Sequence, residues 1–260
     1  MNSVRQSFNR AAPSYDQVAN LQTQVANMLV ALVKKHLPQS FRGLLLDAGC
    51  GTGYCLNALQ PTYPNASLLA LDFAGDMLRQ LPHTFSSQRI NADLQALPLP
   101  AAVLDVYLSS LAWQWCDNQV AAREAARALK PYGEFFAATL VSGTFKELAS
   151  TLAAAELSPA QHVLNCALPQ TIHQCLENAD LDILSAHVES ITTWHPDFKS
   201  LRRSIRGVGA NHLAAGAAAP ISRQARSRLI EAYEGLRTET GLPLTYEVLL
   251  IHARKCRTPS

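Results

Sequence analysis

The chain has 260 residues, of which 48% are hydrophobic and 16% are charged, and its formal net charge is +2. This composition supports one large domain with a sizeable core and excludes a disordered chain. The near balance of charges argues against a nucleic-acid binder, and no apolar run approaches the roughly 18 residues of a membrane span. We expect a cytoplasmic monomer with neither a membrane nor a nucleic acid as partner.

The six cysteines are scattered along the chain and form no Cys-x-x-Cys pair. The spacing typical of metal sites is absent, so we expect no metal ligands among them. We interpret them as buried, reduced thiols.

Two helical patterns open the chain. The first covers residues 4–12, ends at Pro13 and is too polar for a signal peptide. Ser14 followed by Gln17 has the form of a capping box, and apolar residues then keep helical spacing to about residue 36.

From residue 44 onward, short apolar runs alternate with helical patterns. The predicted strands cover residues 44–47, 67–72, 87–91, 105–110 and 134–141. The predicted helices between them cover residues 54–63, 75–81 and 118–129, and residues 130–133 (KPYG) predict a turn. This alternation indicates an α/β fold with a parallel sheet that has helices on both faces.

The alternation lapses after Gly143. Residues 144–180 have an irregular helical pattern, interrupted by Pro159 and Pro169. We then expect a strand at 182–194, a helix at 199–208, a loop at 213–220, a helix around Leu229 and a closing strand at 244–252. No linker divides the chain, so we expect a single domain over residues 1–260, with residues 143–220 as a partly inserted, helical lid that helps to bind substrate.

The strongest chemical pattern is residues 44–53 (LLLDAGCGTG), where a strand runs into three glycines before a helix. Gly49, Gly51 and Gly53 would let a ligand approach the backbone, because no Cβ stands in the way. The spacing differs from a dinucleotide fingerprint, since Tyr54 occupies the place of its third glycine.

Acidic residues lie at the ends of the first three predicted strands. Asp47 would repel a pyrophosphate and favour the ammonium of a methionine moiety. Asp72 can accept from ribose hydroxyls, and Asp93 is placed to accept from an adenine amino group. Together they favour S-adenosylmethionine, with S-adenosylhomocysteine as its product, over NAD. The alternative is an ordinary glycine turn beside helix-capping aspartates.

These residues resemble the class I S-adenosylmethionine-dependent methyltransferases. The resemblance implies a Rossmann-like fold, with a seven-stranded, mostly parallel sheet in the order 3-2-1-4-5-7-6 and an antiparallel last strand. Residues 244–252 would be that strand, and the helices within residues 1–37 would cover the cofactor site.

Further motifs narrow the resemblance. They are FNRAA at 8–12 with Tyr15, Asp16 and Gln22, SSLAWQWC at 109–116, GVGAN at 207–211, AYE at 232–234 and GLPLTYEV at 241–248. From about residue 5 to residue 255, the chain resembles the malonyl-[acyl-carrier protein] O-methyltransferases. One departure is Tyr54-Cys55, where small or polar residues are commoner.

This resemblance implies methylation of the free carboxyl of malonyl-acyl carrier protein. The resulting methyl ester would prime the synthesis of pimelate for biotin, and malonyl-coenzyme A would be a second acceptor. Tyr15, Gln114 and Trp115 are the catalytic candidates, as pocket-wall residues, by their positions in the motifs. A malonyl carboxylate is already ionised at pH 7, so the site needs alignment rather than a general base. The alternative for each residue is a structural role.

A basic stretch is the candidate binding surface for an acidic carrier protein. Lys199, Arg203 and Arg206 fall at i, i+4 and i+7 of a predicted helix, with Arg202 beside them. One of these arginines would bind the malonyl carboxylate through both oxygens. The alternative is an ordinary solvated face.

Three other functions compete with this interpretation. A NAD-dependent oxidoreductase would need a hydride-transfer acid, such as a Tyr-x-x-x-Lys pair, and none follows the fifth predicted strand. A non-catalytic binding protein should have lost its cofactor residues, yet Asp47, Asp72 and Asp93 are present. Another small-molecule or carboxyl methyltransferase with the same cofactor is the third.

Overall fold

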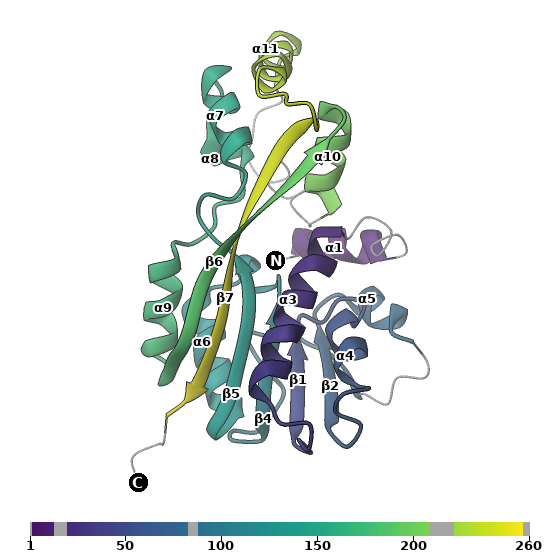
Figure 1. Cartoon of the computed structure of the whole chain (residues 1–260), viewed down its shortest axis with the longest axis vertical. Coiled ribbons are helices and arrows are strands. Elements are labelled where there is room, and N and C mark those ends of the chain that lie inside the picture. The colour runs from purple at the N-terminus through teal and green to yellow at the C-terminus, as the bar shows by residue number, and fades with distance from the viewer. Residues whose placement is uncertain (1, 13–19, 83–87, 208–220, 257–260) are drawn as a thin grey trace.

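The computed structural model describes residues 2–12, 20–82, 88–207 and 221–256. Its centre is a seven-stranded sheet in the order β3-β2-β1-β4-β5-β7-β6 (Figure 1). β7 runs antiparallel to β5 and β6, whereas the pairs among β1 to β5 are parallel. The order and the antiparallel last strand confirm the predicted class I methyltransferase fold.

The described elements follow one another in the order that the sequence predicts. The strands are β1 (Leu44–Ala48), β2 (Ser67–Asp72), β3 (Gln88–Asn91), β4 (Leu104–Ser110), β5 (Leu129–Leu140), β6 (Leu181–His195) and β7 (Leu242–Lys255). The helices are α1 (Asn2–Ala11), α3 (Asn20–His36), α4 (Tyr54–Leu59), α5 (Gly75–Gln80), α6 (Asn118–Ala128), α7 (Lys146–Ala154), α8 (Pro159–His162), α9 (Pro169–Glu177), α10 (Phe198–Gly207) and α11 (Arg223–Glu234), with a 3₁₀ turn η2 (Trp113–Trp115). No helix in these ranges is long and apolar enough to cross a membrane.

Strand β4 shows how the sheet separates two apolar cores. Val106 and Leu108 pack on the face covered by α3 and α4, whereas Tyr107 between them packs on the face covered by α6 and α9. Side chains alternate across a strand, so a strand that is apolar at consecutive positions must be covered on both faces.

The predicted turn at residues 130–133 is a bulge inside β5 rather than a loop before it. The pairing with β4 jumps from Leu104↔Leu129 to Val106↔Glu134, which leaves the residues between unmatched. Tyr132 has a positive φ of 62° there, a conformation that an extended strand does not accommodate.

Strand β7 begins earlier than predicted and contains Pro243. Proline is tolerated because β5 ends at Leu140, opposite Val248, so the start of β7 has β6 on one side only. The N–H of Thr245 points to the free side and donates to the carboxylate of Glu147 at 3.0 Å. Pro243, two residues earlier, faces that side as well and removes no bond of the sheet.

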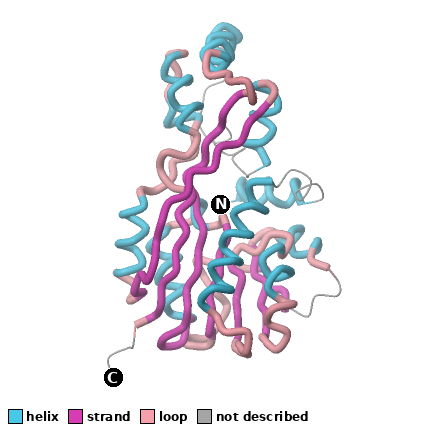
Figure 2. The backbone as a smooth tube through the Cα atoms, in the orientation of Figure 1, coloured by secondary structure: helices cyan, strands magenta, loops and turns pink. Residues whose placement is uncertain are grey.

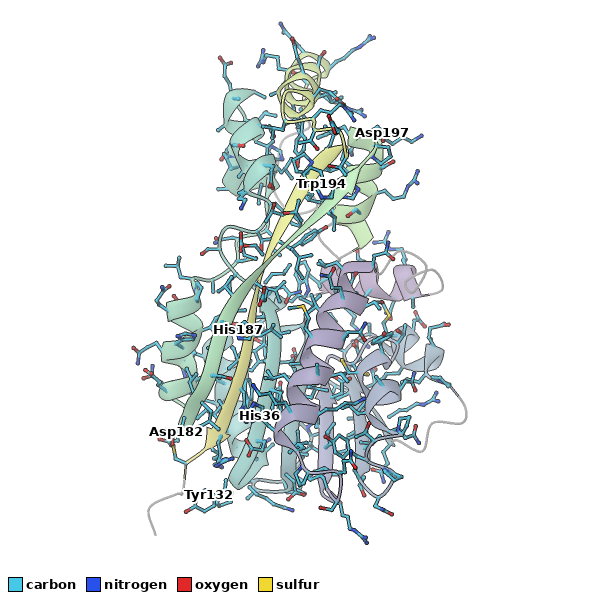
Figure 3. All side chains as sticks on the ribbon, viewed as in Figure 1. His36, Tyr132, Asp182, His187, Trp194 and Asp197 are labelled. Carbon is cyan, nitrogen blue, oxygen red and sulfur yellow. The ribbon has the colours of Figure 1, made fainter. Side chains whose placement is uncertain are left out.

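Beyond the end of β5, β6 and β7 continue as a two-stranded arm, formed by residues 190–195 and 242–247 (Figure 2). Figure 3 marks the two ends of β6: Asp182 lies at the amino edge of the sheet, where Tyr132 is also labelled, and Trp194 lies at the far end of the arm, where Asp197 is labelled. Helices α7, α8, α10 and α11 gather around the arm, whereas α9 packs against α6 and β6 (Figure 1).

The segment predicted as a lid is therefore not one unit. β6 belongs to the sheet and α9 covers one of its faces, while α7, α8 and α10 stand beyond its carboxyl edge. Residues 208–220 lie outside the described part. That residues 143–220 contain a lid over the site stays a prediction.

Aromatic side chains fasten these helices to the arm. Tyr246 of β7 packs edge-on against Phe145, with ring centroids 5.0 Å apart, and shares a hydrogen bond of 3.1 Å with Ser204 of α10. Phe198 of α10 contacts Tyr233 of α11 at 5.4 Å between centroids. These contacts hold helix α10 against the arm and against α11.

The contact between Glu147 and Thr245 should stabilise the arm measurably. Glu147→Ala leaves the Thr245 N–H, in a residue that is 2% exposed, without its acceptor, and we expect a loss of about 1–3 kcal/mol in the free energy of unfolding. The matched control is Glu156→Ala, because Glu156 follows α7 and forms an exposed ion pair with Arg228 of α11. This change should alter the free energy of unfolding by less than about 1 kcal/mol. Equal values from urea denaturation would show that Glu147 does not anchor α7.

Candidate active site

The glycine turn between β1 and α4 has a backbone that favours glycine at three places. Gly49, Gly51 and Gly53 have φ values of 80°, 54° and 84°. A Cβ on Gly49 would come within 2.4 Å of the Ala112 Cβ, and one on Gly53 within 2.1 Å of Leu81. A Cβ on Gly51 would meet nothing within 4 Å, so at Gly51 the backbone faces open space.

Two cavity lobes meet at this turn. The first lobe, of about 620 Å³, is lined by Asp72, Asp93 and Trp115 among others, and the second, of about 490 Å³, by Asp47 and residues of α3. Both are lined by Gly49, Gly51, Ser110 and Leu111, which we call the junction. The α1 residue Phe8 and the α3 residues Gln22, Thr23 and Ala26 complete the walls.

Asp47 is buried without a partner. It is 1% exposed, and neither carboxylate oxygen has a hydrogen bond within the described residues. Burial, together with the charge of Asp72, raises the pKa of Asp47 to about 8. A buried, unpaired acid that lines a cavity suits a ligand that brings a positive charge and N–H donors.

Asp72 holds the glycine turn in place. Its two carboxylate oxygens accept the backbone N–H groups of Gly51 at 2.9 Å and Ala74 at 2.8 Å. Burial raises the pKa of Asp72 to about 6, although these two bonds oppose the shift. Each oxygen keeps a lone pair for a further donor, such as a ribose hydroxyl, in the first lobe.

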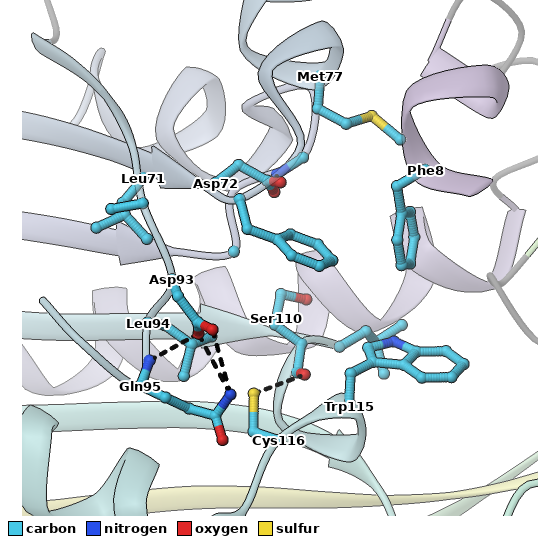
Figure 4. Close-up of a pocket in the computed structure, with 16 residues that line it drawn as sticks. Phe8, Leu71, Asp72, Met77, Asp93, Leu94, Gln95, Ser110, Trp115 and Cys116 are labelled. Atoms are coloured by element: carbon cyan, nitrogen blue, oxygen red, sulfur yellow. Dashed lines mark hydrogen bonds between the residues drawn. The ribbon is translucent and has the colours of Figure 1, made fainter. Parts of the chain in front are cut away.

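Asp93 and Trp115 lie on the opposite wall of the first lobe (Figure 4). An oxygen of Asp93 accepts the backbone N–H of Gln95 at 2.9 Å. The indole N–H of Trp115 is buried without a described acceptor, and the ring packs edge-on against Phe8 at 6.1 Å between centroids. A buried donor beside a cavity can serve a ligand oxygen.

The other two catalytic candidates are not on the described wall. Tyr15 falls outside the described residues. The amide of Gln114 lies behind the wall, where it donates to the Leu111 carbonyl at 2.7 Å and accepts from the Thr139 hydroxyl at 3.1 Å. Both ends of that amide are occupied by the scaffold.

The basic candidates lie on α10, beyond the carboxyl edge of the sheet. Lys199 and Arg203 are exposed, and Arg202 is half-buried. Arg206 belongs to α10, but its side chain is outside the described set. Leu201 and Ile205 bury the opposite face of the helix against the arm.

Several residues that line the two lobes could not be predicted as site residues, or were not, from the sequence. Phe73 directly follows the acidic end of β2, so its position after Asp72 was a usable signal. Phe8 and Leu111 lie inside quoted motifs, but nothing in their residue type pointed to a cavity wall.

Comparison with known proteins identifies relatives over nearly the whole chain. The Methyltransferase domain family matches residues 46–137. Malonyl-[acyl-carrier protein] O-methyltransferases from Dechloromonas aromatica and Herminiimonas arsenicoxydans are 41% and 38% identical, over 97% and 96% of this chain and 94% and 95% of theirs. The fold is similar to geranyl diphosphate C-methyltransferase from Streptomyces coelicolor in complex with S-adenosyl-L-homocysteine (TM-score 0.52, 14% identity, 88% of this chain and 78% of that one).

The raised pKa of Asp47 should make cofactor binding depend on pH. Below its pKa of about 8 the free protein holds a proton there, which a cationic ligand must displace, so affinity should rise by up to about tenfold per pH unit from 6.5 to 7.5. Calorimetry with S-adenosylmethionine in buffers of different ionisation enthalpy would count the released proton. Asp47→Asn should weaken binding and abolish this dependence, and a flat profile in the parent would contradict the assignment.

The same residue should oppose folding. The folded pKa of about 8 exceeds the ordinary carboxyl value, so the ligand-free protein loses stability as pH rises from about 4 to about 8. Asp47→Asn stays neutral and should raise the free energy of unfolding at pH 7.5 by on the order of 1–4 kcal/mol. A variant that loses both affinity and stability would instead indicate a structural role.

Proposed function

Because the chain belongs to the family of malonyl-[acyl-carrier protein] O-methyltransferases, we propose that it transfers a methyl group from S-adenosylmethionine to the free carboxylate of malonyl-acyl carrier protein. The product is a malonyl methyl ester, which primes pimelate synthesis for biotin. The observation that carries the proposal at the site is Asp47, a buried carboxylate with no partner in the described chain, beside an open glycine turn.

The two lobes divide the cofactor between them. Asp72 and Asp93 hold the ribose and the adenine in the first lobe, and Asp47 holds the methionine ammonium in the second. The turn at Gly49, Gly51 and Gly53 lets the ligand lie against the backbone between the lobes. When bound in this way, S-adenosylmethionine supplies an electrophilic methyl group on a positively charged sulfur.

No general base is needed for this transfer. The malonyl carboxylate is ionised at neutral pH and attacks as it stands, so the walls have only to align it and exclude water. Tyr15 and Trp115 are the wall residues assigned to this task, and the unpaired indole N–H of Trp115 supports its assignment. Gln114 lies behind the wall and supports it through its hydrogen bonds with Leu111 and Thr139.

Competing nucleophiles in the cavity are kept neutral. Cys50 and Cys55 line the second lobe and Cys116 lines the first. Burial raises the pKa of the Cys50 and Cys55 thiols well above the usual value, and raises that of Cys116 to about 12. A thiolate would attack the methyl donor, so neutral thiols protect the enzyme from methylating itself.

Carrier protein docks on α10. Helix α10 offers positive charge to an acidic partner through Lys199, Arg202, Arg203 and Arg206. The hydrogen bond that holds α10 against the arm supports its role as a docking surface. Malonyl-coenzyme A is a weaker substitute because it lacks the carrier surface. The enzyme acts as a cytoplasmic monomer, and its six cysteines, all described and unpaired, suit a reducing compartment.

A single assay tests the proposed reaction. Incubation with malonyl-acyl carrier protein and S-adenosylmethionine should add one methylene to the mass of the carrier. Acetyl-acyl carrier protein, which has no free carboxyl, is the control and should gain nothing. An unchanged malonyl carrier, or equal modification of both carriers, would overturn the proposal.

The basic helix should matter for the carrier and little for the cofactor. Arg203→Glu should raise the Michaelis constant for malonyl-acyl carrier protein by on the order of 3–10-fold at low salt, because exposed charges mainly speed encounter. It should leave malonyl-coenzyme A nearly unaffected. The matched control is Arg42→Glu, an exposed arginine just before β1 at the amino edge of the sheet. If both variants behave like the parent at low salt, α10 is only a solvated face.

A further inference from the structure

Leu111 has an unusual backbone conformation at the centre of the site. Its φ is +51°, a left-handed value that is rare for a branched, non-glycine side chain. Leu111 also belongs to the junction, the group of residues that lines both lobes. Strain of this kind is unfavourable by about 1–3 kcal/mol and persists only where surrounding contacts impose it.

The contacts that impose it come from Gln114 and β5. The Leu111 N–H donates to the Ala138 carbonyl at 2.8 Å, and its carbonyl accepts from the Gln114 side chain at 2.7 Å. The other end of the Gln114 amide accepts from the Thr139 hydroxyl, in a residue that is 1% exposed. A carbonyl can only accept, so the amide of Gln114 has one orientation that satisfies both partners.

Two parts of the pocket, the glycine turn and Trp115, contact Ala112, the residue after Leu111. The Ala112 methyl occupies the place where a Cβ on Gly49 would lie, so the glycine turn packs directly on it. The Ala112 carbonyl accepts the backbone N–H of Trp115 at 3.1 Å. A change in the Leu111 backbone would therefore move the turn and the indole together.

We propose that Gln114 is a positioning residue, which acts on methyl transfer by clamping Leu111 in its left-handed conformation at the junction. The inference rests on the proposed function, because it assumes that adenosine lies in the first lobe and the methionine ammonium in the second. The sulfur and its methyl group then lie at the junction. An error of a fraction of an ångström there lowers the rate, while the anchors at Asp47 and Asp72 keep the cofactor bound.

Single variants first separate rate from affinity. Gln114→Met keeps the length of the side chain but makes neither hydrogen bond, and we expect kcat to fall by about 10–100-fold. The affinity for S-adenosylhomocysteine, measured by calorimetry, should stay within about threefold of the parent. Thr139→Val loosens only the far end of the clamp and should lower kcat by a smaller factor. A parent-like kcat in Gln114→Met would overturn the proposal.

A double-mutant cycle then tests the mechanism of the clamp. Glycine adopts a positive φ without strain, so in a Leu111→Gly background the further change Gln114→Met should lower kcat by less than about twofold. The same large loss in both backgrounds would mean that Gln114 acts directly on a substrate, and the clamp would be wrong. Gln114→Glu repeats the cycle should Gln114→Met fail to fold, because a carboxylate still accepts from Thr139 but cannot donate to Leu111.

Failure of this inference is distinguishable from failure of the proposed function. The parent is assayed beside the variants with malonyl-acyl carrier protein. No transfer by the parent counts against the proposed function, whereas an active parent with an equally active Gln114→Met variant counts against the clamp alone.

Discussion

Two carboxylates buried at the carboxyl edge of the sheet set the conditions for the rest of the site. Asp72 is stabilised by the N–H groups of Gly51 and Ala74, so the fold itself compensates for its burial. Asp47 has no such compensation in the described chain, so it holds a proton below its pKa of about 8, and keeping a carboxyl group protonated at neutral pH is unfavourable relative to the unfolded chain. The glycine turn beside Asp47 is open at Gly51, which lines both lobes of the cavity. The protein therefore stores, as unfavourable burial of Asp47, a free energy that a cationic ligand can recover on binding.

The arm raises a second structural problem, which is how two strands remain stable beyond the end of the sheet. Strands that leave a sheet expose unpaired backbone groups, and β7 does so once β5 has ended. Glu147 takes the Thr245 N–H, and the Phe145 N–H donates to the Thr245 carbonyl at 2.7 Å. These bonds satisfy the backbone groups of Thr245 in place of a neighbouring strand, so the arm that carries α10 does not leave them unpaired.

The sequence predicted those features whose causes are local. Gly49, Gly51 and Gly53 follow a buried strand, and the acidic residues at strand ends could be identified by position alone; the strand order came from the family resemblance. The conformation of Leu111 could not be predicted, because it depends on Gln114 and on Ala138 and Thr139 in the next strand rather than on leucine itself. The bulge in β5 and the early start of β7 were missed for a similar reason, since each depends on where a neighbouring strand begins or ends.

The polarity of the cavity suits a reaction that destroys charge. Transfer of a methyl group from a sulfonium to a carboxylate turns two opposite charges into a neutral thioether and a neutral ester. Water stabilises the separated charges more than the neutralised transition state, so apolar walls favour the reaction. Phe8, Phe73 and Leu94 provide such walls, and no lysine or arginine is among the described residues that line either lobe. A guanidinium held against the malonyl carboxylate would draw electron density from the attacking oxygen. This argument favours our proposals that the basic residues of α10 dock the carrier and that neutral groups, such as the indole of Trp115 and the backbone of Leu111, align the carboxylate.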